Sequence, residues 1–253
     1  MRIAVVSLFP VMLREALMHG VLGRAIERGL LGVECTDPRD YATDVHRSVD
    51  DRPYGGGPGM VLKVEPLRSA MRAAVASMPA GSRRVYLGAD GRRFEQATAR
   101  EACTWPGLIL VAGRYEGVDE RFIDAEIDEE WSIGDYVLSG GELPALVVID
   151  AIGRLLPGAL GSTESALQES FTAELVDWPH YTRPPSVGGR EVPAVLSSGD
   201  HAAIERWRLQ QALGRTWLRR PELLERRGMN DEERALLEEF KIERAKVHES
   251  SRR

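Results

Sequence analysis

Residues 108–113 read Leu108-Ile109-Leu110-Val111-Ala112-Gly113, a run of five apolar side chains that ends at a glycine. Such an uninterrupted run is typical of a parallel strand that is covered on both faces. Helices are predicted on either side of it, at 94–103 and at 142–156. The second carries one apolar stripe, formed by Leu143, Val147, Ala151 and Leu155. Strands that alternate with helices indicate an α/β layered domain.

The same alternation extends towards the N-terminus. Strands are predicted at 2–8 and 84–89, and a helix at 65–78. A further helix is predicted from Pro10 to a stop at Gly29, because proline suits the first turn of a helix and glycine suits its end. Its apolar positions have helical spacing and are Leu13, Leu17, Val21 and Ala25.

The character of the sequence changes after Gly158. The next segment, 161–170, is polar and rich in small residues, which indicates a mobile linker or the start of a weak helix. Beyond a proline-rich stretch, helices are predicted at 198–214 and 231–247. The sequence therefore predicts three parts: an α/β domain at 1–160, a flexible linker at 161–175 and a small, mostly helical domain at 176–253.

The composition is that of an ordinary soluble globular protein. Of 253 residues, 43% are hydrophobic and 28% are charged. No apolar run reaches the roughly 18 residues that a membrane helix needs, and the apolar run at the N-terminus is too short for a signal peptide. Cys35 and Cys103 are too few for a disulfide framework or a metal site, so we expect a cytoplasmic protein in a reducing compartment.

Charge is distributed unevenly along the chain. The net charge of −6 argues by itself against a nucleic-acid partner. Segment 119–130 carries seven acidic residues and one arginine, whereas segment 201–227 carries seven arginines and three glutamates. Arginine suits contacts with phosphates and bases. Around Trp207 and Trp217, arginines alternate with aromatic rings, which indicates either a helix core with solvated arginines or a face that contacts RNA.

Glycine-rich bends follow the central strand, at 113–121 and 132–144. Glycines at the carboxyl edge of a parallel sheet are typical of a ligand-binding crevice, although tight turns are the alternative. No Gly-x-Gly-x-x-Gly fingerprint stands between a strand and a helix, which makes a nicotinamide or flavin enzyme a weak alternative. The segment 50–60 is also glycine-rich but lacks the Gly-Lys-Ser/Thr of a P-loop, so we interpret it as a substrate-facing loop or a wide turn.

Arg154 and the histidines are ambiguous on the sequence alone. Arg154 lies near the C-terminal end of the predicted helix 142–156, where it could either pair with the helix dipole or bind a carbonyl oxygen of a ligand. His46 and His201 are isolated from any metal-binding spacing.

The chain resembles the bacterial tRNA (guanine-N1)-methyltransferases, the TrmD family of the SPOUT superfamily. The resemblance covers nearly the whole chain and rests on the two glycine-rich bends and on four further segments, 7–10, 49–60, 178–184 and 213–221. It implies a parallel α/β sheet with a trefoil knot, a rare exception to the usual rules of chain topology. It also implies a homodimer whose active sites are built from both chains, with a helical C-terminal domain that binds tRNA.

The activity implied by this resemblance is methyl transfer from S-adenosyl-L-methionine to N1 of the guanine immediately 3′ of the anticodon (position 37) in tRNA. The implied cofactor-binding residues are Tyr86, Leu87, Gly113, Tyr115, Glu116, Gly117, Ile133, Gly134, Asp135, Tyr136, Val137, Leu138, Gly140, Gly141 and Pro144. The implied tRNA-binding residues are His46, Asp50, Ser197, Gly199, His201 and Arg208.

The implied catalytic residues are Glu169 and Arg154. Glu169 stands where the family most often has an aspartate as general base, and the extra methylene moves the carboxylate by about 1.5 Å. Arg154 matches the arginine that stabilises charge on guanine O6. The family is described as needing Mg²⁺, with Glu116 and Glu169 as candidate contributors and no assigned ligands. The alternative is a knotted protein that binds RNA without chemistry.

Overall fold

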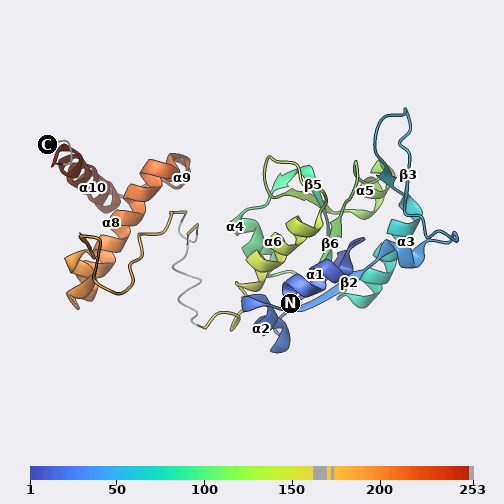
Figure 1. The fold of residues 1–253 in the computed structure, drawn as a ribbon, viewed down its shortest axis with the longest axis horizontal. Coiled ribbons are helices and arrows are strands. Elements are labelled where there is room, and N and C mark those ends of the chain that lie inside the picture. The colour runs from blue at the N-terminus through green and yellow to red at the C-terminus, as the bar shows by residue number, and fades with distance from the viewer. Residues whose placement is uncertain (162–169, 172–173, 251–253) are drawn as a thin grey trace. The chain divides into compact units, whose positions relative to one another are not determined.

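The computed structural model describes residues 1–161, 170–171 and 174–250, with side chains up to residue 246. The chain divides into two compact units, Met1–Thr163 and Glu164–Arg253 (Figure 1). Most of the predicted linker 161–175, including Glu169, lies outside the described residues. Among the described residues, no helix is long and apolar enough to cross a membrane.

A parallel sheet forms the centre of the N-terminal unit. Its five described strands stand in the order β2-β1-β6-β5-β7, and every neighbouring pair is parallel. The predicted strand 108–112 is confirmed as β6, and it is fully buried because it lies in the middle of the sheet. The other strands of the sheet are β1 (Arg2–Val6), β2 (Gly32–Thr36), β5 (Arg83–Arg93) and β7 (Glu129–Ser132).

Helices cover both faces of this sheet (Figure 1). Alternate residues of β6 point to opposite faces: Leu108 and Leu110 pack in one core cluster, Ile109 and Val111 in the other. The first cluster is covered by α1 (Pro10–Leu17), α2 (Gly20–Glu27), α4 (Gln96–Ala102) and α6 (Glu142–Gly153). The second is covered by α3 (Val64–Ser77) and α5 (Glu120–Glu126). The predicted α/β layered domain is confirmed.

The single helix predicted from Pro10 to Gly29 is wrong, because the chain breaks into α1 and α2. Gly20 has φ of +65°, a left-handed conformation that interrupts the helix. Next to the break, Gly23 approaches the Met18 carbonyl so closely that a Cβ atom would lie 2.3 Å from its oxygen. The helical spacing of Leu13, Leu17 and Ala25 is nevertheless reflected in their burial in one core cluster.

Strand β5 is longer than the predicted 84–89 and contains an irregularity. Trp131 of β7 pairs with both Leu87 and Arg92, so the intervening residues bulge out of the ladder. Gly91 allows this close approach, since a Cβ atom there would lie 2.5 Å from the Trp131 nitrogen. The bulge carries Gly88 and Ala89 away from regular pairing at the carboxyl edge of the sheet.

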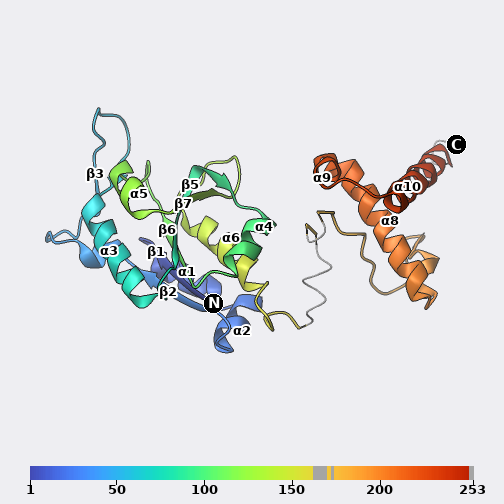
Figure 2. The ribbon, with the colours of Figure 1, turned by 180° about the vertical axis from the view of Figure 1, so that it is seen from behind.

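The C-terminal unit is mostly helical, as predicted. It contains α8 (His201–Arg219), α9 (Pro221–Arg227) and α10 (Asp231–Ser250), and both α9 and α10 pack on α8 (Figure 2). A small hairpin, β8 (Ser186–Val187) and β9 (Arg190–Glu191), and a 3₁₀ turn, η2 (Ala194–Ser197), precede α8. The core of this unit consists of Leu175, Ala212, Leu213, Leu224, Leu236 and Leu237.

Candidate functional site

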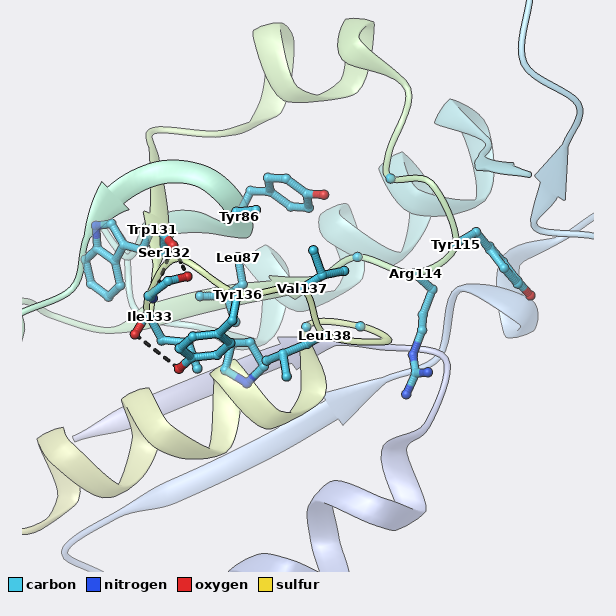
Figure 3. A pocket seen from close by; sticks show the side chains of 18 of the residues that line it. Tyr86, Leu87, Arg114, Tyr115, Trp131, Ser132, Ile133, Tyr136, Val137 and Leu138 are labelled. Carbon is cyan, nitrogen blue, oxygen red and sulfur yellow. Dashed lines mark hydrogen bonds between the residues drawn. The ribbon is translucent and has the colours of Figure 1, made fainter. Parts of the chain in front are cut away.

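A cavity of about 210 Å³ lies at the carboxyl edge of the sheet, where β5, β6 and β7 end or bulge. This is where open parallel sheets bind ligands. In Figure 3, Tyr86 projects from β5 above the loop that carries Tyr136, Val137 and Leu138. The cavity is lined by Tyr86, Leu87, Gly88, Ala89, Gly113, Arg114, Tyr115, Glu116, Gly117, Trp131, Ser132, Ile133, Gly134, Tyr136, Val137, Leu138, Gly140, Gly141 and Pro144.

The structure brings together the predicted cofactor-binding residues, apart from Asp135. Asp135 instead points outward, with 92% of its side chain exposed and Oδ2 3.5 Å from Nη2 of Arg93. Five further lining residues were not predicted: Gly88, Ala89, Arg114, Trp131 and Ser132. Each lies within two positions of a predicted residue in the sequence, so extending the predicted segments by one or two positions would have found them.

Two glycines make room for the tyrosine rings that line the cavity. At Gly113, a Cβ atom would lie 2.7 Å from the Tyr86 hydroxyl oxygen, so any other residue would collide with the ring. At Gly134, φ is +151° and a Cβ atom would lie 2.5 Å from the Tyr136 ring. The Tyr136 hydroxyl donates a 3.3 Å hydrogen bond to the carbonyl of Ile133, which folds the loop on itself. These positions require glycine for steric reasons.

The surroundings of Tyr86 are acidic. Burial, together with the nearby carboxylates of Asp90, Glu130 and Glu120, raises the pKa of Tyr86 to about 12. Burial also raises the pKa of Glu130, with smaller contributions from neighbouring acids. Tyr86 therefore stays a neutral hydrogen-bonding phenol at physiological pH, and the negative potential around it favours a positively charged ligand.

The glycine-rich segment 50–60 is joined to the cavity loop by backbone hydrogen bonds. The Glu116 amide donates to the Met60 carbonyl and the Leu62 amide donates to the Gly117 carbonyl, each at 3.0 Å. Asp50, in the short strand β3 (Asp50–Asp51), pairs with Leu62 of β4 (Val61–Leu62). At the tip of the segment Tyr54 is 99% exposed, so the tip projects into solvent. A substrate-facing role stays a prediction.

A second cavity, of about 720 Å³, lies beside this segment. Its lining carries both signs of charge, and the charged residues are Arg52, Lys63, Arg121, Asp51, Glu65, Asp119 and Glu120. His46 is exposed and lies outside both cavities, with its backbone amide 2.9 Å from Oδ1 of Asp44.

Arg154 caps the C-terminal end of α6 and does not line the first cavity. Pro144, which does line it, stands in the first turn of the same helix. Ten residues separate the two, which at about 1.5 Å per residue places their backbones roughly 15 Å apart. Glu169 lies outside the described residues. Within one N-terminal unit, Arg154 and the glycine-lined cavity are therefore at opposite ends of α6.

The remaining predicted substrate residues gather at one end of the C-terminal unit. Ser197 ends η2, Gly199 has φ of +77°, and His201 and Arg208 lie two turns apart on α8. The Arg208 guanidinium stands 5.0 Å from the centre of the Trp178 ring and donates to Glu205 at 2.6 Å. Tyr181 and Trp207 are in ring contact nearby. This arrangement of arginines and aromatic rings suits stacking on bases.

No described group of three or more His, Cys, Asp and Glu side chains is arranged to hold a metal ion.

Known proteins match nearly the full length of this chain. The family described as tRNA (Guanine-1)-methyltransferase TrmD matches residues 1–226. Proteins named tRNA (guanine-N(1)-)-methyltransferase are similar: one from Methylococcus capsulatus is 63% identical over 243 residues (96% of this chain, 97% of the relative). Another, from Chromohalobacter salexigens, is 59% identical over 251 residues (97% and 94%), and one from Salmonella typhi is 59% identical over 245 residues (97% and 96%). This chain belongs to the tRNA (guanine-1)-methyltransferase family.

Proposed function

We propose that this protein transfers a methyl group from S-adenosylmethionine to N1 of the guanine immediately 3′ of the anticodon, position 37, in tRNA. The observation that carries the proposal is the glycine-lined cavity with acidic surroundings at the carboxyl edge of the sheet. The names of the relatives supply the reaction and the nucleobase. A tRNA substrate would place the reaction in the cytoplasm.

The cavity residues fit a sulfonium nucleoside. Gly113 and Gly134 carry no side chain, and none would fit beside the tyrosine rings. The backbone at these positions can therefore approach the ligand directly. Tyr86 and Tyr136 offer aromatic surfaces to an adenine or a cation. The carboxylates near Tyr86 favour the positive charge of this donor. When bound, S-adenosylmethionine supplies an electrophilic methyl group.

The chain must also activate the guanine. Its N1 carries a proton and is a poor nucleophile until a base removes that proton. We assign this role to Glu169, whose longer side chain replaces the usual aspartate of the family. As the proton leaves, negative charge grows on O6, and we assign its stabilisation to the Arg154 guanidinium. If Mg²⁺ takes part, Glu116, which lines the cavity, and Glu169 are the candidate contacts.

We propose that the active site is completed in a homodimer. Arg154 lies roughly 15 Å along α6 from Pro144, so a second copy could place its Arg154 beside this copy's cavity. A dimer would also cover exposed apolar side chains on α1 and α6, namely Val11, Met12, Leu143 and Val147. In the same proposal, residues 1–160 bind the donor and residues 176–253 bind tRNA.

The trefoil knot is part of this proposal. The segment after β7 returns across the end of β6, where Gly141 donates a 2.9 Å hydrogen bond to the Gly113 carbonyl. Arg114 and Gly140 form an isolated antiparallel bridge at the same place. Such a return crossing is what a chain that threads its own loop requires.

The test is to incubate the purified protein with a tRNA transcript and S-adenosylmethionine carrying a labelled methyl group. We expect label in the tRNA, and mass mapping should place one methyl group on the guanine 3′ of the anticodon. Binding of tRNA without label would favour the non-catalytic alternative. Label at another nucleotide would contradict the assigned target.

A further inference from the structure

A buried carboxylate lies directly behind the cavity. Glu142, the first residue of α6, is 1% exposed and does not line the cavity. Its Oε1 accepts a 2.7 Å hydrogen bond from the Ser7 hydroxyl at the end of β1. Its Oε2 accepts a 2.8 Å hydrogen bond from Nε of Arg114, just beyond the end of β6. One side chain therefore joins three segments at the carboxyl edge of the sheet.

Arg114 extends this link to the walls of the cavity. It lines the cavity, and Nη1 donates to the Ser139 carbonyl at 3.1 Å. Its guanidinium carbon stands 4.3 Å from the centre of the Phe9 ring. A Cβ atom on Gly140 would lie 2.3 Å from Nε of Arg114 and 2.7 Å from Oε2 of Glu142. Loop 113–117 and loop 132–141 are thus fastened together through Arg114 and its carboxylate.

Stability alone does not explain this pair. Removing charges from water costs several kcal/mol per ion, and well-packed apolar residues usually stabilise a core at least as well. The Arg114 side chain is 19% exposed and the Glu142 side chain 1%, so the carboxylate bears most of the desolvation. What the pair provides is a fixed separation between two loops that are rich in glycine and would otherwise be free to move.

We infer that Glu142 is a positioning residue for the methyl donor: acting through Arg114, it holds the two cavity loops at the spacing that the donor requires. The inference rests on the proposed function, because it presumes that the cavity binds S-adenosylmethionine. It assigns Glu142 no contact with the donor or with the guanine. Ser7 completes the arrangement by donating a hydrogen bond to the other carboxylate oxygen of Glu142.

The test compares the full-length protein with Glu142→Gln, Arg114→Gln, the double variant and Ser7→Ala. The control is Asp128→Asn, which weakens the Arg84–Asp128 ion pair (Nη2 to Oδ1, 2.7 Å) at the opposite edge of the sheet. Each protein is assayed for its Kd for S-adenosylmethionine by calorimetry, for KM and kcat in methyl transfer, and for its melting temperature.

The Glu142→Gln variant keeps the shape of the side chain, but its amide cannot accept hydrogen bonds at both terminal atoms, as the carboxylate does from Ser7 and Arg114. We therefore expect the Kd and the KM for the donor to rise about tenfold or more. At saturating donor, kcat should change by less than about threefold, because the group acts on binding geometry. The double variant should bind the donor no more weakly than Arg114→Gln within about twofold, since both changes break one linkage. Asp128→Asn should keep its donor Kd within about twofold of wild type.

Glu142→Gln with unchanged Kd and KM would overturn the inference, as would additive effects in the double variant. If the Glu142→Gln variant does not fold, Ser7→Ala becomes the deciding test, because it keeps the charges of Glu142 and Arg114. This variant should weaken donor binding by about threefold. Unchanged binding in Ser7→Ala would then overturn it. Wild-type protein that neither binds the donor nor methylates tRNA would refute the proposed function itself, and the inference with it.

Discussion

In the unit Met1–Thr163, glycines and backbone groups at strand ends make up much of the candidate binding surface, whereas in the unit Glu164–Arg253 the candidate groups are long side chains on α8. The first arrangement fixes shape, because one loop follows the fully buried strand β6 and is joined to the other loop through Arg114 and Glu142. The second offers charge and ring surfaces to a flexible polyanion. The difference suits a small donor on one side and an RNA on the other.

The two units also differ in how they are held together. The sheet of the first unit has a core cluster on each face, and each cluster draws on several helices. Among the described residues of the second unit, the buried apolar side chains form one smaller cluster, and polar side chains cap its helices. At the start of α10, the amides of Asn230 and Glu233 donate to each other's side chains at 3.1 and 2.9 Å, and Arg227 pairs with Glu233. Such caps stabilise a helix end.

The largest expected effect separates chemistry from donor binding. We expect Arg154→Ala and Glu169→Ala each to lower kcat for methyl transfer by about 10²-fold or more, through lost charge stabilisation and lost proton removal. Donor affinity should stay within about twofold of wild type, because both side chains are assigned to act on the guanine and not on the donor. Single-turnover kinetics and calorimetry check both quantities. Full activity in both variants would sink the residue assignments.

The next prediction tests whether the N-terminal cavity depends on the absence of side chains. Gly113→Ala puts a Cβ atom 2.7 Å from the Tyr86 hydroxyl oxygen, so either the ring or the loop must move. We expect the donor Kd to rise about tenfold or more. The matched control is Gly32→Ala on β2, where the nearest atom outside the neighbouring residues is 3.9 Å from the added Cβ. Equal donor affinities in the two variants would show that the cavity is not shaped by Gly113.

The parts that the sequence predicted best were those with a strong local pattern. The apolar run 108–112 appears as β6, and the helix predicted at 142–156 appears as α6. Two residues of its predicted stripe, Leu143 and Val147, are nevertheless 46% and 47% exposed. Edge strand β2 was not predicted, because Gly32-Val33-Glu34-Cys35-Thr36 is half exposed and lacks a continuous apolar run. Strand β7 was not predicted either, since Glu129 and Glu130 precede Trp131 and the segment has no apolar run.

The candidate site shows the same limit. Its loops were predictable because their glycines cluster in two short segments, 113–117 and 134–141. The link from Glu142 to Ser7 was not, because 135 residues separate the two and neither side chain alone signals its partner. Such a contact depends on the strand order of the folded sheet, which local propensity does not determine.

A smaller effect is expected from the C-terminal unit. Arg219 is exposed near the end of α8, in the arginine-rich part of that helix. If it contacts a phosphate, Arg219→Ala should weaken tRNA binding by a few fold and reduce the slope of log K against log salt by about 0.7 to 0.9. Its donor Kd should equal that of wild type. Filter binding across a salt series measures the slope. An unchanged slope would show that Arg219 does not contact a phosphate of the tRNA.

The smallest effect at neutral pH concerns Tyr86, and it becomes visible only in alkali. Burial and nearby carboxylates raise its pKa from 10.0 to about 12 in the folded protein. Between these values the unfolded chain ionises Tyr86 while the folded chain does not. The stability that Tyr86 contributes is therefore complete below about pH 10 and is lost as the pH rises towards 12.

We accordingly expect the ultraviolet titration of tyrosinate to include one transition near pH 12 that Tyr86→Phe removes and Tyr181→Phe, in the other unit, retains. The free energy of unfolding should fall more steeply above pH 10 in wild type than in Tyr86→Phe, because only wild type has the ionising phenol. If Tyr86→Phe keeps the late transition, the phenol is not in the acidic, buried surroundings described. The cavity would then lose the feature that favours a positively charged donor, and the contrast between the proposed donor site and the proposed RNA surface would weaken.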